Sequence, residues 1–116
     1  MSGSNTAETL WRNIISILCA SPQDVQTVLQ NGSAGIWIHA KSDNGVIVID
    51  RAKNNTPSSE LNSPRYINKN EFIMLYPLYF KWRKGSISRE QAKGGSMSSS
   101  YIFALINKFL DDSTST

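Results

Sequence analysis

One stretch in the middle of the chain decides its fold, and it reads Gly35-Ile-Trp-Ile-His-Ala-Lys-Ser-Asp-Asn-Gly-Val-Ile-Val-Ile-Asp-Arg51. Two runs rich in β-branched residues, 36–40 and 46–50, flank the polar segment 42–45. Such runs favour strands, and the Asn-Gly pair between them is a strong turn signal. The stretch therefore predicts an antiparallel β-hairpin at the centre of the fold.

Two registers are open to this hairpin. A two-residue turn at Asn44-Gly45 places Ile38 opposite Arg51, whereas a longer turn places Ile38 opposite Ile49. We favour the second register because it brings isoleucines opposite one another on one face. A lone hairpin is only marginally stable, so helices are expected to cover that isoleucine face. The opposite face would carry Trp37, His39, Val48 and Asp50.

Two helices are expected before the hairpin. Residues 5–20 begin with a capping-box pattern and continue with apolar residues at helical spacing. Ser21-Pro22 ends this helix and begins a second one, because proline is tolerated at the first helical position. The short apolar stripe of the second helix would consist of Val25, Val28 and Leu29, and Asn31-Gly32 would end it.

An aromatic helix is expected after the hairpin. Residues 52–66 read as a polar loop that is longer than most connections. Asn68 and Glu71 then form a capping-box pattern that opens a helix over residues 69–84. Pro77 lies inside this helix and should kink it, and Gly85 should close it. The aromatic side chains of this helix are Phe72, Tyr76, Tyr79, Phe80 and Trp82.

A short helix and a long helix complete the expected fold. Ser88-Arg-Glu-Gln91 is a second capping box, and Gly94-Gly95 should end the helix that it opens. The last helix should start at Ser98 or Ser99, with an apolar stripe of Tyr101, Ile102, Leu105, Ile106 and Phe109. The sequence thus predicts one α+β domain over residues 1–116, with disordered tails at about 1–5 and 112–116. Its elements would be two N-terminal helices, a central antiparallel β-hairpin, a kinked aromatic helix and a C-terminal pair of helices.

Composition excludes several classes of protein. The chain has 116 residues and a single cysteine, Cys19, so it is not an internally disulfide-bonded secreted scaffold. We expect that thiol to be buried within a helix. No apolar run approaches the roughly 20 residues of a membrane span, and the first residues lack a signal-peptide pattern. A cytoplasmic protein without a membrane partner is therefore expected.

Little in the sequence points to an enzyme. His39 is the only histidine, so neither a multi-histidine metal site nor a usual zinc ligand set is available. No glycine-rich phosphate loop of known spacing is present. We interpret His39 and Asp50 as structural neighbours on the hairpin, and a nuclease-like grouping of Asp50, Lys53 and Glu60 as chance. The expected protein is non-enzymatic and uses no cofactor and no metal.

The charge distribution gives the stronger functional signal. The whole chain carries a net charge of +3, but residues 60–110 hold eight basic and three acidic residues, a net charge of +5. A concentrated positive charge of this kind is either an ordinary solvated surface or an electrostatic footprint for phosphates.

A resemblance of one segment to known proteins favours the interpretation of this charge as a phosphate-binding surface. Residues 85–106 read Gly85-Ser-Ile-Ser-Arg-Glu-Gln-Ala-Lys-Gly-Gly-Ser-Met-Ser-Ser-Ser-Tyr-Ile-Phe-Ala-Leu-Ile106. This segment resembles the helix-turn-helix segments of DNA-binding proteins, in which a glycine-containing turn joins a short helix to a recognition helix. The resemblance implies DNA as the partner, with hydroxyls at the start of the last helix near phosphates. The candidate nucleic-acid-binding residues are Arg65, Arg83, Lys84, Arg89, Ser98, Ser99, Ser100 and Tyr101.

A second resemblance covers scattered positions between residues 57 and 102, including Pro57-Ser-Ser, Pro64-Arg and Ser100-Tyr-Ile. These positions are similar to segments of small uncharacterised bacterial proteins linked to mobile elements or restriction systems. The alternative function is a protein-interaction or oligomerisation module, most simply a two-fold homodimer. Its support is the aromatic run of the helix at 69–84, because aromatic residues are enriched in interfaces.

Overall fold

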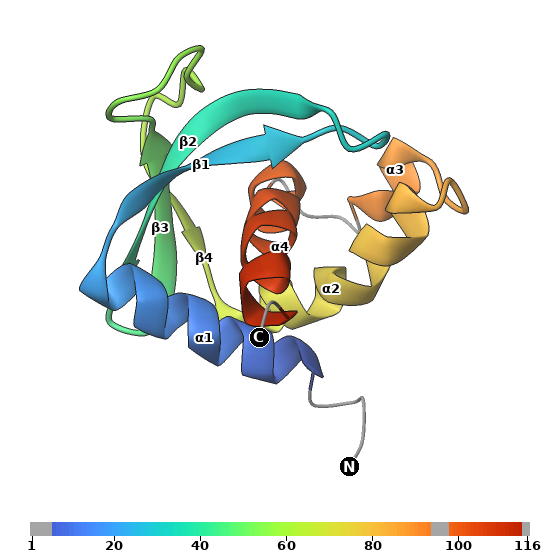
Figure 1. Ribbon diagram of the computed structural model, residues 1–116, viewed down its shortest axis with the longest axis horizontal. Helices are drawn as coiled ribbons and strands as arrows, with labels where there is room; N and C mark the ends of the chain where they lie inside the picture. Colours follow the sequence, from blue (N-terminus) through green and yellow to red (C-terminus); the bar gives the residue numbers. More distant parts are fainter. Residues whose placement is uncertain (1–5, 94–97, 115–116) are drawn as a thin grey trace.

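The computed structural model describes residues 6–93 and 98–114 (Figure 1). In chain order its elements are α1 (Thr6–Ala20), β1 (Gln23–Val28), β2 (Ala34–Asp43), β3 (Val46–Arg51), β4 (Arg65–Ile67), α2 (Lys69–Arg83), α3 (Arg89–Ala92) and α4 (Ser99–Thr114). The four strands form one antiparallel sheet in the order β1-β2-β3-β4. The α+β class is therefore confirmed, with a larger sheet than a single hairpin.

The central hairpin is confirmed as β2 and β3, but the register that the isoleucines favour is wrong. Asn44 and Gly45 have φ values of 54° and 81°, the pair of positive angles that a two-residue type I′ turn requires. Ile38 consequently pairs with Arg51. The two candidate registers differ by two residues, so both place the same side chains on the inner face. The hydrophobic pattern therefore fits both registers equally well, and the geometry of the turn determines which register forms.

The second N-terminal helix is wrong, because its residues form the edge strand β1. Val25 lies opposite Ile38 in the β1–β2 pair, and the register shifts between Gln26 and Val28. Val25 and Val28 are both buried, so their spacing of three imitates a helical stripe. Figure 1 shows the β1–β2 ribbon curving over α4. Strand pairing and this curvature, which local spacing does not reveal, override the helical pattern.

The long loop after β3 is shorter than expected, because its last residues pair with β3 as β4. The remaining segment, 52–64, returns along β2 where β3 has ended. There the Trp37 amide donates to the Pro57 carbonyl at 2.8 Å, and the Ser59 amide donates to the Trp37 carbonyl at 2.9 Å. These bonds form a short parallel bridge at Ser58 and fix the middle of the loop.

The caps of α2 follow its sequence. The Asn68 side chain accepts from the Glu71 amide at 2.8 Å, which confirms the predicted start. At the other end Gly85 has a φ of 82°. The Gly85 amide donates to Trp82 at 3.0 Å and the Ser86 amide to Lys81 at 2.9 Å, as in a Schellman motif. Helix α2 continues without a break through Pro77.

Helix α4 is the centre of the molecule (Figure 1). Five consecutive residues, 102–106, are buried, so the middle of this helix is covered around its circumference and does not present a single apolar stripe. The short helix α3 precedes it with the capping box expected at Ser88 and Gln91. α4 reaches Thr114 and so includes residues 112–114, which the sequence assigns to a tail. The expected Asn5 cap, the Gly94-Gly95 stop and the N-terminal tail lie outside the described residues.

The structure also bears on the predictions about Cys19 and about membrane-spanning segments. Cys19 is exposed on α1, so the prediction of a buried thiol is wrong. Among the helices that the structure describes, none combines the length and apolarity that crossing a bilayer would need.

Candidate functional site

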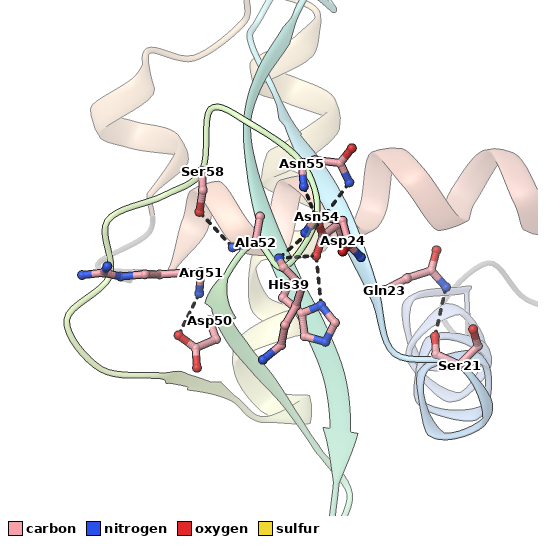
Figure 2. A network of polar contacts seen from close by, with 11 residues as sticks. Ser21, Gln23, Asp24, His39, Asp50, Arg51, Ala52, Asn54, Asn55 and Ser58 are labelled. Atoms are coloured by element: carbon pink, nitrogen blue, oxygen red, sulfur yellow. Dashed lines mark hydrogen bonds and ion pairs between the residues drawn. The ribbon is translucent and has the colours of Figure 1, made fainter.

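The most highly organised polar site surrounds the carboxylate of Asp24 (Figure 2). Asp24 lies on the outer face of the sheet, because its neighbour Val25 in β1 is buried on the inner face and successive strand residues alternate. The side chain of Asp24 is only 4% exposed. It accepts hydrogen bonds from three consecutive loop amides, those of Lys53 at 2.9 and 3.2 Å, Asn54 at 2.8 Å and Asn55 at 3.0 Å. The Asn55 side-chain amide adds a fourth donor at 3.0 Å. One carboxylate therefore holds the start of the loop.

This arrangement explains how the loop crosses the sheet. Asp24 is on β1, whereas the loop leaves β3, on the other side of β2. Residues 53–55 must therefore pass over the outer face of β2 to reach the carboxylate. The Ser58 hydroxyl also accepts from the Ala52 amide at 2.9 Å, which closes the loop on itself. The loop is consequently fixed at several points over the outer face.

The same carboxylate orients the only histidine. His39 lies directly opposite Asp24 in the β1–β2 pair, and its Nδ1 is 3.0 Å from Asp24 Oδ1. Burial by itself would raise the pKa of Asp24, but the hydrogen bonds from the loop and from His39 outweigh it and hold that pKa far below its usual range. Because an ionised carboxylate can only accept, Nδ1 carries the proton of neutral His39 and leaves Nε2 as an acceptor.

A pocket of about 190 Å³ adjoins the imidazole. We call it the His39 pocket, and its lining residues are Pro22, His39, Lys41, Val48, Asp50 and Lys53. Asp50 pairs with His39 across β2 and β3, and its Oδ1 accepts the Arg51 amide at 2.7 Å. The pocket therefore combines apolar walls with a fixed imidazole, two lysines and one carboxylate that already has a partner.

The nuclease-like grouping of Asp50, Lys53 and Glu60 is brought together only in part. Asp50 and Lys53 line the His39 pocket, but Glu60 does not. No cluster of three potential metal ligands occurs among residues 6–93 and 98–114.

A second candidate surface lies at the opposite side of the molecule, where α2 ends and α3 follows (Figure 1). Residues 81–93 contain five basic side chains and one acidic side chain, Glu90. We call this region the basic end; its cations are Lys81, Arg83, Lys84, Arg89 and Lys93. Lys81 and Lys84 are exposed, while Lys93 lies 3.7 Å from Glu90. Three of the predicted binding residues, Arg83, Lys84 and Arg89, therefore belong to the segment in which positive charge is concentrated.

The two arginines of the basic end are anchored within the protein. Arg83 donates from Nε to the Gln30 carbonyl at 3.1 Å and from Nη1 to the Tyr79 hydroxyl at 2.9 Å. Arg89 lies over two rings, with its Cζ 5.2 Å from the centroid of Trp82 and 5.4 Å from that of Phe103. Burial lowers the pKa of Arg89. Both side chains are half-buried and hold neighbouring elements together.

The other predicted binding residues are distributed unevenly. Ser98 and Ser99 are buried, Tyr101 is half-buried and Ser100 is exposed. The Ser100 hydroxyl accepts a hydrogen bond from Arg89, so these two residues are brought together. Arg65 begins β4, before α2, and the 12 helical residues 69–80, about 18 Å at 1.5 Å per residue, lie between it and Lys81 of the basic end.

Sequence reasoning misses the role of Asp24. Its position after Pro22 suggests a residue that favours a helix start. The only local sign of its true role is the run Lys53-Asn-Asn55, because asparagines are common in turns whose amides need acceptors. The 29-residue separation between Asp24 and Lys53 carries no sequence signal. Comparisons with protein families, with curated proteins and with solved structures find no match to this chain.

Proposed function

We propose that this protein is a non-enzymatic nucleic-acid-binding protein that holds DNA phosphates at its basic end. The observation that carries the proposal is the exposure of Lys81 and Lys84 beside three further cations, with Glu90 as the one carboxylate of that segment. Within the described residues, neither lysine takes part in an ion pair. Unpaired cations gathered on one surface attract the phosphate backbone and release its counterions on binding.

The surroundings of these lysines support binding. The Schellman motif at Gly85 satisfies the Lys81 and Trp82 carbonyls, which would otherwise present partial negative charge at the end of α2. Arg83 and Arg89 keep their charge while aromatic rings fix their positions. A surface whose cations are positioned in advance loses less conformational entropy when it meets a polyanion.

The alternative function, self-association, has less support. The aromatic run of α2 is largely used within the molecule, because Phe72, Tyr79 and Trp82 are buried. The hairpin is also flanked by β1 and β4, so its own edges are already paired. The same binding experiment should therefore include a measurement of molecular mass, which tests the homodimer directly.

The test uses fluorescence anisotropy with labelled duplex and single-stranded DNA at several salt concentrations. We expect K81A/K84A to bind more weakly than the natural protein at low salt. Its log–log salt slope should be shallower by about 1.8, at about 0.9 for each lost phosphate contact. The change should be similar for all DNA sequences, since phosphate contacts carry no sequence information.

The matched control is R12A/K108A, which removes the same charge from exposed positions on α1 and α4. This control should retain most of the affinity. Equal weakening by both double variants would indicate attraction to overall charge and would refute a localised site. Failure of the natural protein to bind either form of DNA at low salt would reject the proposed function.

A further inference from the structure

The His39 pocket is built in a way that the basic end does not explain. Asp24 is buried and accepts five donor groups, so a chain of hydrogen bonds fixes the loop and the imidazole together. The His39 side chain is 14% exposed, and its ring reaches the pocket.

The charges around the pocket favour an anion. Lys41 on β2 and Lys53 on the loop contribute two positive charges, against Asp50 on β3. Asp50 already accepts the Arg51 amide. The carboxylate of Asp24 on β1 is directed toward the loop amides and His39 Nδ1 and does not line the pocket. With His39 protonated, three cationic groups line the pocket.

The size and lining of the pocket suit a small anion better than a large ligand or a metal ion. Its volume of about 190 Å³ is below the roughly 300–1,000 Å³ of pockets that hold drug-sized ligands. A metal ion lacks a ligand set, since the described residues contain no cluster of three potential ligands. Pro22 and Val48 supply apolar walls that would strengthen hydrogen bonds at the floor.

We propose that the His39 pocket binds the phosphate of a small phosphate monoester or inorganic phosphate, with His39 Nε2, Lys41 Nζ and Lys53 Nζ as donors. The inference does not rest on DNA binding, because residues of β2, β3 and the following loop line the pocket, whereas the basic end comprises the last turn of α2 and the segment through α3 (Figures 1 and 2). Donation from Nε2 requires His39 to be an imidazolium, because Nδ1 already donates to Asp24. Asp24 positions that imidazolium and has no contact with the ligand.

The test follows the His39 ring signals by NMR during titration with inorganic phosphate. Sulfate is a second probe, because it stays doubly charged over the whole pH range and reports on His39 alone. We expect both anions to shift the ring signals saturably and to move the midpoint of the His39 titration to higher pH. Chloride at the same ionic strength should do neither. Equal effects of chloride and phosphate would overturn the proposal.

Variants locate the site without disturbing the Asp24–His39 pair. K41A and K53A should each weaken phosphate binding about tenfold, the loss expected for one charge-assisted hydrogen bond. The backbone amide of Lys53 still bonds Asp24 in K53A. The control R12A removes an exposed positive charge from α1, outside both proposed sites, and should leave phosphate binding unchanged. Phosphate affinities of K41A and K53A equal to that of R12A would refute the assignment.

The source of the phosphate is tested with a short oligonucleotide, with and without a 5′-phosphate. A monoester site predicts His39 shifts only for the 5′-phosphorylated form. Equal shifts with both forms would make the ligand an internal phosphodiester and overturn the monoester assignment. Loss of DNA binding in K81A/K84A with retained phosphate shifts would show that the two sites are separate.

Discussion

Replacement of Asp24 by asparagine should destabilise the protein and change its response to acid. An asparagine oxygen in the place of Oδ2 keeps the bonds from the Asn54 amide and from both Asn55 donors. Each of these bonds would fall from a charge-assisted strength of about 1.5–3 kcal/mol to a neutral strength of about 0.5–1.5 kcal/mol. A loss of about 1 kcal/mol for each of these three bonds gives about 3 kcal/mol. The amide nitrogen in the place of Oδ1 cannot accept the bonds that Oδ1 receives from His39 Nδ1 and the Lys53 amide, so the total destabilisation is at least this large.

The pH dependence follows from the lowered pKa of Asp24. A carboxyl whose pKa is lower in the folded chain than in the unfolded chain stabilises the fold fully above its ordinary pKa, near 4. That contribution is lost as the pH falls below about 4 toward the folded value. The natural protein should therefore lose this stability in acid, and D24N should lack the corresponding part of the pH dependence.

Urea denaturation at pH 7 and at pH 3, monitored by circular dichroism, measures both effects. The control is D43N, which changes an exposed aspartate of the hairpin in the same way. D24N should lose at least about 3 kcal/mol of unfolding free energy at pH 7. At pH 3 the loss should be smaller by about 1 kcal/mol, because one titrating group changes stability by at most about 1.4 kcal/mol per pH unit. A loss at pH 7 no greater than that of D43N would refute the role assigned to the carboxylate.

Two further variants test the packing. R89K keeps the positive charge but loses the planar contacts with Trp82 and Phe103; it should lower the unfolding free energy by about 1–2 kcal/mol, and an unchanged urea midpoint would contradict this. G35A places a Cβ 2.2 Å from the Thr27 hydroxyl oxygen; thermal unfolding should show a loss of about 1–3 kcal/mol. Addition of T27A should recover much of that loss, and a purely additive double variant would argue against a clash.

Local sequence signals are sufficient to predict the elements whose capping or turn residues lie at their own ends. The Asn68 cap, the Ser88 box and Gly85 are all found where the sequence places them, because each satisfies backbone groups within a few residues. The hairpin turn at Asn44-Gly45 has the same local origin. Its register is missed only when isoleucine pairing is given more weight than the turn, since a two-residue shift keeps every side chain on its face.

The rest of the fold depends on partners distant in the sequence. β1 is a strand because β2 lies beside it, and the positions of Val25 and Val28 by themselves resemble a helical stripe. The Asp24 site is of the same kind, since one carboxylate joins β1, β2 and a loop about 30 residues away. Sequence spacing could identify the basic end but could not show that Arg89 lies against aromatic rings.

The salt dependence of DNA binding by the natural protein tests the central proposal most directly. Anisotropy titrations over a range of salt concentrations give the slope of log affinity against log salt. If the basic end neutralises about four phosphates, the slope should be near −3.6, at about −0.9 per contact. A slope near zero, or no binding at low salt by protein shown to be folded, would contradict the assignment of the basic end as a phosphate-binding surface.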